Sequence, residues 1–275
     1  MDKLMDILTG FLMGPAFSIG NLIWQFLMGM VTGVMTTSPS AFSQEAWDYV
    51  RLVLYPWAQS IGIALLNTWF FIGFIKQNTD LKQNFTFEVF VKLCINVIAA
   101  NALILGMIRI IHGFFWMASA LTGQVLHGSS ISFSNADLDV GTWAFFAIFG
   151  FIYVLVALIC GGMIFLTVYS RYIKILFMVA TGPIALSTIA GGQGISNTAI
   201  AWVKTFLGYL FEIVAIAIVL TIGSKLIHSI NWMTGGALDS YMNGFWGAIQ
   251  SLITMIILAA SVKGTDGMLR RAFAL

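Results

Sequence analysis

Two charged side chains lie inside long apolar runs of this sequence. Arg109 stands in ANALILGMIRIIHGFF and Glu212 stands in FLGYLFEIVAIAIVL. A charge at the centre of a bilayer costs about 3 kcal/mol or more unless it is paired or faces water. Their opposite signs predict that Arg109 and Glu212 pair inside the membrane. Snorkelling toward an interface, a polar path and a contact between subunits are the other interpretations of the same charges.

The segment 16–36, AFSIGNLIWQFLMGMVTGVMT, carries a stripe of polar and small residues. Asn21, Gln25, Gly29 and Gly33 recur at close to helical spacing, so they share one face of a helix. The stripe predicts a face for helix packing, because small residues let helices approach closely. The other interpretation is that copies of this helix together line an aqueous path. The sequence leaves open which one holds and whether 16–36 spans the bilayer.

The side chains that commonly carry catalysis or bind metals are sparse and scattered. His112, His127 and His228 form no metal-ligand pattern, and Cys94 and Cys160 both sit in apolar runs. Paired catalytic carboxylates, a serine-hydrolase elbow and a phosphate-binding glycine loop are absent from the sequence. We therefore expect neither an enzyme nor a metal or cofactor site.

The composition is that of a membrane protein. Of the 275 residues, 59% are hydrophobic and only 9% are charged, and the mean hydropathy is +0.93. A soluble domain has roughly 25% charged residues. Long apolar segments recur from end to end, which predicts an all-α, polytopic integral membrane helical bundle.

The apolar segments predict about five spans and an N-terminal region of different character. The spans are expected at about 50–75, 87–122, 142–169, 203–224 and 245–262. Residues 3–13 predict a short amphipathic helix, because their apolar residues recur at helical spacing. We therefore expect an N-terminal part, 1–46, with the amphipathic helix and the polar-striped helix. The membrane-embedded domain is expected to be 47–275.

The positions of Lys and Arg predict the topology, because cytoplasmic loops are enriched in both. The loop 123–141 has none, whereas Arg171, Lys174 and the C-terminal tail are basic. All these cations share the cytoplasmic side only if the apolar segment 175–190 does not cross. We therefore expect that segment to be re-entrant or interfacial, with a break at the Gly-Pro pair 182–183. The C-terminus is then cytoplasmic.

Two consecutive stretches resemble the TrbL-like family of polytopic channel subunits of conjugation and type IV secretion machines. They are RYIKILFMVATGPIALSTIAGG and AWVKTFLGYLFEIVAIAIVL, and the resemblance covers about 142–224. The shared pattern is a cationic span end, an apolar stretch with a proline, a small-residue turn, and then a tryptophan and a further span. The short form found in single-membrane bacteria is the most similar. The matching positions are Arg171, Lys174, Pro183, Gly191, Gly192, Trp202 and Lys204.

The resemblance implies a channel or translocation subunit in the cytoplasmic membrane, which helps to move a DNA–protein substrate. It further implies a homo-oligomer that works with other membrane subunits and with cytoplasmic ATPases, surrounded by membrane lipid. The cargo implied is single-stranded DNA with its attached relaxase. The cytoplasmic cations do not by themselves indicate DNA binding, because the positive-inside rule explains them equally well.

Two other functions remain open on the sequence. A secondary transporter would show inverted repeats and broken helices at a midplane site, and the Gly-Pro pair is the one such feature found. A membrane scaffold protein would use its helices only to hold partners together.

Overall fold

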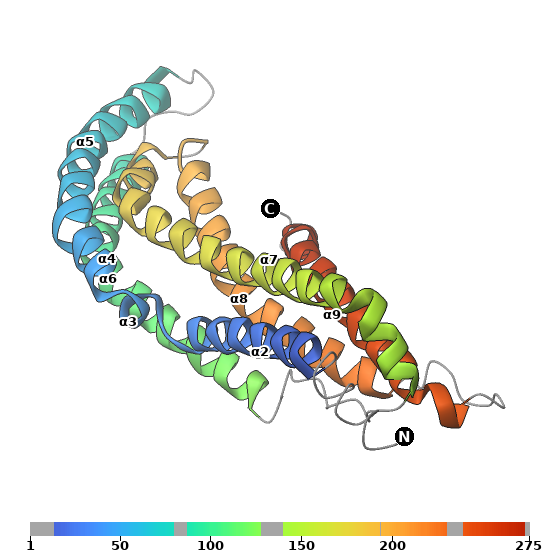
Figure 1. Ribbon diagram of the computed structural model, residues 1–275. Helices are drawn as coiled ribbons and strands as arrows, with labels where there is room; N and C mark the ends of the chain where they lie inside the picture. The colour runs from blue at the N-terminus through green and yellow to red at the C-terminus, as the bar shows by residue number, and fades with distance from the viewer. Residues whose placement is uncertain (1–13, 80–86, 128–139, 193, 230–238, 273–275) are drawn as a thin grey trace. The chain divides into compact units, whose positions relative to one another are not determined.

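The computed structural model is all-α, as the sequence predicts. The structure describes residues 14–79, 87–127, 140–192, 194–229 and 239–272, and no strand occurs among them. The amphipathic helix predicted at 3–13 lies outside these residues. The elements in chain order (Figure 1) are α2 (Gly14–Thr36), α3 (Pro39–Phe42), α4 (Gln44–Tyr49), the π-helix η1 (Val50–Leu54), α5 (Tyr55–Thr79), α6 (Phe87–Leu126), α7 (Val140–Ser187), the 3₁₀-helix η2 (Thr188–Gly191), α8 (Asn197–Ser229) and α9 (Asp239–Ala272).

Six helical stretches in the described part of the chain are long and apolar enough to cross a membrane. They are Ile19–Thr36, Gln44–Lys76, Phe90–Leu126, Phe149–Gly191, Asn197–Leu226 and Gly247–Leu269. The last five correspond to the five predicted spans. The first contains the polar stripe, and it adds a sixth candidate span where the sequence left the matter open. The protein is therefore a multi-pass helical membrane protein.

Helix α7 continues through the Gly-Pro pair, so the predicted break at 182–183 is wrong. The α-helix has 48 residues with Pro183 inside it, and it passes into η2. Proline removes one backbone hydrogen bond without necessarily ending a helix. The chain turns instead at Gly192 and Gly194, whose φ angles of 73° and 90° suit glycine. At ~1.5 Å per residue α7 is about 72 Å long, against a hydrocarbon core of ~30 Å. That 175–190 does not cross stays a prediction.

The chain forms two compact units, each assembled from separate stretches of sequence. The first unit comprises residues 1–36, 121–169 and 213–268, and the second unit comprises 37–120, 170–212 and 269–275. Helices α6, α7 and α8 each contribute residues to both units. In the first unit, residues from the middle of the chain pack against the N-terminal helix α2.

Small residues set the packing of α2 on α7 in the first unit. A Cβ at Gly20 would lie 2.6 Å from the ring of Tyr153, and a Cβ at Gly161 would lie 2.7 Å from a methyl group of Leu27. Glycine at both positions therefore lets the two helices approach closely. Tyr153 is fully buried at this contact.

In the second unit α5 lies beside the C-terminal end of α7 and η2 (Figure 1). Gly62 and Gly73 are three helical turns apart, so they lie on one face of α5. A Cβ at Gly62 would lie 2.6 Å from the carbonyl oxygen of Pro183, and one at Gly73 would lie 2.9 Å from that of Gly191. The two glycines thus admit the backbone of α7 and η2 directly against α5.

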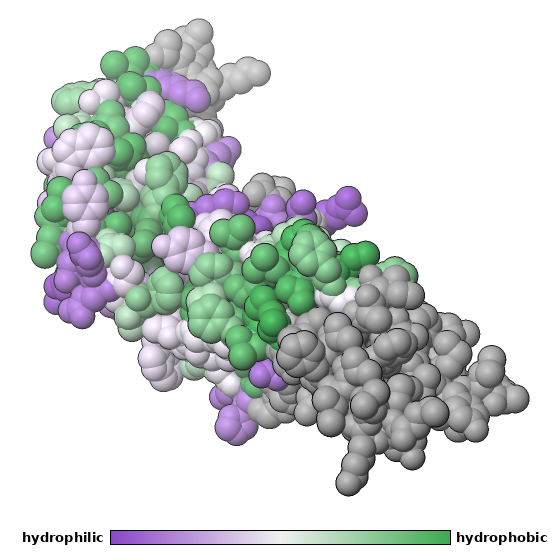
Figure 2. Space-filling view, in the orientation of Figure 1, coloured by the Kyte–Doolittle hydropathy of each residue, from purple (hydrophilic) through white to green (hydrophobic). Residues whose placement is uncertain are grey.

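The surface is as apolar as a lipid environment requires. Figure 2 shows that apolar and weakly polar side chains cover much of the visible described surface, with hydrophilic residues confined to a few places. Large hydrophobic side chains are exposed in both units, for example Phe151, Phe71 and Ile98. Such extensive exposed apolar surface is typical of membrane proteins, in which lipid replaces water as the neighbour.

Candidate functional site

A buried ion pair joins α7 to α8 in the second unit. The guanidinium Nη2 of Arg171 lies 2.5 Å from the carboxylate Oε1 of Glu212, and both side chains are almost fully buried. The two helices run antiparallel on either side of the turn at Gly192–Ser196. Arg171 is 21 residues before Gly192, where the turn begins, and Glu212 is 16 residues after Ser196, where it ends. The ion pair joins the two helices well away from the turn.

The predicted pair between Arg109 and Glu212 is not formed. Arg109 is exposed near the middle of α6, and no described carboxylate lies within ion-pair distance of it. Glu212 is instead paired with Arg171, which the sequence placed at the cytoplasmic end of a span. α7 continues past Arg171 as one helix to Ser187. Arg171 therefore lies inside the hairpin, opposite Glu212, and not at a span end.

Aromatic contacts surround the ion pair and fix its register. The ammonium of Lys174, one helical turn after Arg171, lies 5.4 Å from the ring centroid of Tyr209. Cation–π contacts of this kind are worth about 0.5–2 kcal/mol depending on desolvation. The hydroxyl of Tyr172 donates a hydrogen bond of 2.8 Å to the carbonyl oxygen of Thr37. These contacts hold α7 against α8 and against the segment that follows α2.

Pro183 and Trp202 also belong to the family-like pattern. Both lie where two helices pack closely together. The Pro183 carbonyl meets Gly62 of α5, as described above. The half-buried indole of Trp202 packs near Gly182 of α7 and stacks on Phe206, with ring centroids 5.5 Å apart and planes 5° from parallel. These residues have a structural role in the hairpin, because they set how closely α5, α7 and α8 pack.

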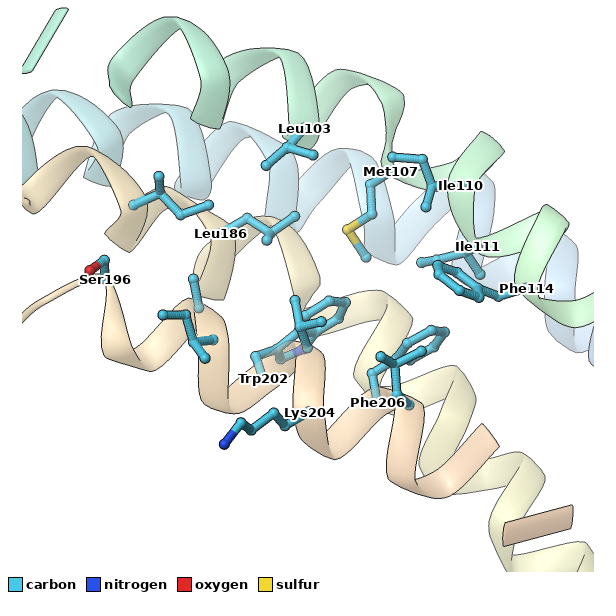
Figure 3. A pocket seen from close by; sticks show the side chains of 15 residues that line it. Leu103, Met107, Ile110, Ile111, Phe114, Leu186, Ser196, Trp202, Lys204 and Phe206 are labelled. Atoms are coloured by element: carbon cyan, nitrogen blue, oxygen red, sulfur yellow. The ribbon is translucent and has the colours of Figure 1, made fainter. Parts of the chain in front are cut away.

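An apolar groove lies between α6 and α8 in the second unit (Figure 3). Its volume is about 500 Å³, and nearly all of the lining side chains are hydrophobic. α6 contributes Met107 and Phe114, α7 contributes Leu186, and α8 contributes Trp202 and Phe206. Lys204, the last residue of the family-like pattern, is exposed and borders the groove with its aliphatic stem.

A polar network is buried in the first unit, between α2, α7 and α9. The hydroxyl of Tyr153 donates a 2.9 Å hydrogen bond to Oδ1 of Asn21. The Ser251 hydroxyl lies 3.4 Å from the Tyr153 oxygen and donates to the Ala248 carbonyl at 2.8 Å. Buried polar groups in a membrane protein need such partners. The Asn21 end of the predicted stripe is therefore a helix-packing face.

The rest of the stripe faces away from the first unit. Gln25, Gly29 and Gly33 are exposed, and a Cβ at either glycine would meet no heavy atom within 4 Å. The Gln25 amide makes no hydrogen bond to a described residue. The stripe therefore divides into one buried position, Asn21, and an outward row, Gln25–Gly29–Gly33, hereafter the outward stripe.

The chain was compared with known proteins at three levels. No protein-family model, no curated protein and no solved structure matches it. The resemblance to the TrbL-like family therefore rests on the sequence pattern over 142–224 alone.

The Arg171–Glu212 pair and the Tyr153 network were missed by reasoning from the sequence. The ion pair has a signal in the sequence, because Arg171 and Glu212 are opposite charges on two consecutive apolar stretches, which an antiparallel hairpin places side by side. That signal depends on placing the turn at Gly192–Ser196 rather than at Gly182. The Tyr153 network has no such signal, because it joins three helices that are far apart along the chain.

Proposed function

We propose that this chain is a channel subunit of a translocation machine in the cytoplasmic membrane, of the kind used for conjugation and type IV secretion. Several copies would enclose an aqueous path, and the substrate that passes would be DNA with an attached protein. The chain itself would supply no covalent chemistry. Cytoplasmic ATPases would supply the energy for transfer.

The outward stripe of α2 is the observation that carries this proposal. A primary amide in hydrocarbon without a hydrogen-bond partner costs about 4–8 kcal/mol. Gln25 stands on a candidate span, is exposed, and finds no partner within the described chain. Gly29 and Gly33 follow on the same face, where they leave backbone accessible. Water or a second subunit would supply hydrogen-bond partners to the Gln25 amide on this face, whereas lipid would not.

A second outward polar surface lies on α6. Arg109 and Asn101 are both exposed, about two turns apart, in a helix that is otherwise apolar. A cation that faces lipid without a partner raises the free energy of the protein, as does the Gln25 amide in hydrocarbon. Polar groups that face outward in both units favour an assembly in which neighbouring subunits or water cover them.

The class of machine and its cargo come from the sequence pattern. The cationic residues Arg171 and Lys174, together with Pro183, Trp202 and Lys204, support a TrbL-like subunit. In this fold Arg171 and Lys174 are engaged by Glu212 and Tyr209. Of these three cations, Lys204 is therefore the one whose ammonium is available to a polyanion or a lipid phosphate.

A transfer assay in the native host tests the proposal. Gln25→Leu and Gly33→Leu make the outward stripe apolar, while Phe151→Leu and Leu166→Phe alter exposed apolar positions of α7 in the same unit. A channel subunit predicts that the stripe variants lose DNA transfer while the membrane complex still assembles, and that the two controls transfer normally. Normal transfer by both stripe variants, in a strain whose deletion mutant transfers nothing, would contradict the proposal.

The same variants separate the two alternatives. A membrane scaffold predicts that the stripe variants lose assembly of the complex, as seen by crosslinking and native gels. A secondary transporter predicts uptake of a small solute by vesicles that contain this chain alone.

A further inference from the structure

The groove between α6 and α8 is apolar along its length and open on one side. Met107, Phe114 and Phe206 form its interior, and the ring centroids of Phe114 and Phe206 are 6.5 Å apart. Ile110 and Ile200 at its edges are 47% and 54% exposed. A molecule in the surrounding bilayer can therefore enter the groove from the side.

Polar and basic residues stand beside one end of the groove. Ser196 lies at that end, at the start of α8, and Figure 3 shows the Lys204 side chain extended along α8 toward the same end. The ammonium of Lys76 lies 3.7 Å from the Cβ position of Gly194, two residues before Ser196. Lys204 stands two residues before Phe206, and its side chain carries the ammonium back toward the Ser196 end.

The dimensions of the groove restrict what it can hold. Ser196 and Phe206 are ten residues apart on α8, which is about 15 Å. A volume of about 500 Å³ over that length leaves a cross-section of roughly 33 Å². An α-helix about 10 Å across has a cross-section of roughly 80 Å² and would enter this groove only in part, whereas an alkyl chain lies fully within it. The length also equals half of a ~30 Å hydrocarbon core, the depth of one leaflet.

We propose that this groove binds an anionic phospholipid, with one acyl chain between α6 and α8 and the phosphate at Lys204. The acyl chain matches the apolar lining and the length of one leaflet. The phosphate matches the ammonium groups at the polar end, since each basic residue near a membrane surface contributes about 1 kcal/mol to binding an anionic lipid. This inference is independent of the proposed function, because it concerns the second unit and not the outward stripe.

A photoreactive lipid locates the binding site. The full chain is reconstituted with phosphatidylglycerol that carries a diazirine on one acyl chain, irradiated, and digested for mass spectrometry. The proposal predicts crosslinks concentrated at the groove residues Met107, Phe114 and Phe206. Leu105 and Ile98 are exposed on the same helix α6 outside the groove, and they serve as the bulk-lipid reference. Equal labelling of the reference and groove residues would overturn the proposal.

Substitutions test the role of charge. Native mass spectrometry counts phosphatidylglycerol and phosphatidylcholine retained by each purified variant. Lys204→Gln is expected to weaken phosphatidylglycerol retention roughly fivefold and to leave phosphatidylcholine unchanged. Lys204→Arg keeps the charge, so it is expected to retain as much phosphatidylglycerol as the parent chain. Lys263→Gln removes an exposed cation from the first unit and should change neither lipid. Equal losses from Lys204→Gln and Lys263→Gln would show a nonspecific effect of net charge and would overturn the proposal.

Filling the groove tests the acyl chain separately. Val203 is 40% exposed and lines the groove, so Val203→Trp should displace both lipids while the variant still elutes as a folded protein in gel filtration. Unchanged retention of both lipids by folded Val203→Trp would contradict binding in the groove. A disulfide between copies through Val203→Cys in the membrane would show that a second chain occupies this face instead, and would also contradict it.

Discussion

Arg171 of α7 and Glu212 of α8 form an ion pair, 2.5 Å between nitrogen and oxygen, across the hairpin that the two helices make. The pair lies inside the hairpin with almost no exposed surface. A buried ion pair adds little net stability over well-packed apolar residues, but removing one partner leaves an uncompensated charge. The pair therefore acts mainly by fixing the register of the hairpin, together with the Lys174–Tyr209 contact one turn away.

Breaking the Arg171–Glu212 pair should destabilise the second unit. Arg171→Ala or Glu212→Ala alone should lower the free energy of unfolding by about 3–5 kcal/mol, because each leaves a buried charge without its partner. The exchange Arg171→Glu with Glu212→Arg should recover much of the loss. Thermal unfolding in detergent gives the comparison. If the double exchange loses as much unfolding free energy as the two single alanine variants lose together, the result would contradict this role.

Enlarging the glycines of α5 should separate it from α7. Gly62→Leu places side-chain atoms against the Pro183 carbonyl, and overpacking of this kind costs about 1–3 kcal/mol. Gly106→Leu on α6 is the matched control, because a Cβ there meets no heavy atom within 4 Å. Unfolding of both variants in detergent tests the difference. Equal stability of the two variants would show that α5 does not pack on α7 as described.

Removing the Tyr153 hydroxyl should cost about 1 kcal/mol, with a further penalty for leaving the buried Asn21 amide short of a partner. Tyr153→Phe is therefore expected to lower the stability of the first unit by about 1–3 kcal/mol. Tyr169→Phe, at a position that is 41% exposed on the same helix, should stay within about 0.5 kcal/mol of the parent. A loss in Tyr153→Phe no larger than in Tyr169→Phe would argue against the network.

The turn between α7 and α8 should be cytoplasmic. Asn197 is exposed at the start of α8 and avoids the positive φ of Gly194, so Asn197→Cys is suited to labelling. In intact cells an impermeant thiol reagent should leave Asn197→Cys unlabelled and should label Ser134→Cys, in the loop without Lys or Arg. Lysed cells should label both. External labelling of Asn197→Cys would mean that 175–190 crosses the membrane.

The sequence was sufficient for the fold class and for the five principal spans, because a membrane requires long apolar helices and these are visible in composition. It was insufficient for details that depend on packing. Pro183 was expected to interrupt α7, but a proline removes only one backbone hydrogen bond, and α5 packs closely against its carbonyl through Gly62. The turn falls nine residues later, at Gly192.

The contacts of the candidate site also depend on packing, which the sequence does not reveal. The apolar run around Glu212 indicates a buried charge that requires a partner, but the sequence places Arg171 at a span end and so does not indicate that Arg171 is the partner. Asn21 and Gln25 share one sequence stripe, and only the position of Tyr153 reveals that one is buried and the other faces outward.

Thiol accessibility of the outward stripe tests the central claim most directly. In a chain with Cys94→Ala and Cys160→Ala, single cysteines replace Gln25, Gly29 or Gly33 in membranes that contain the assembled machine. Phe151→Cys and Leu166→Cys, at exposed apolar positions of α7 in the same unit, are the lipid-facing references. Thiols react as thiolates, which form in water and not in hydrocarbon. The channel account predicts rapid modification at the stripe by a small water-soluble reagent, with slow modification at the references. Stripe cysteines that react no faster than Phe151→Cys and Leu166→Cys would contradict it.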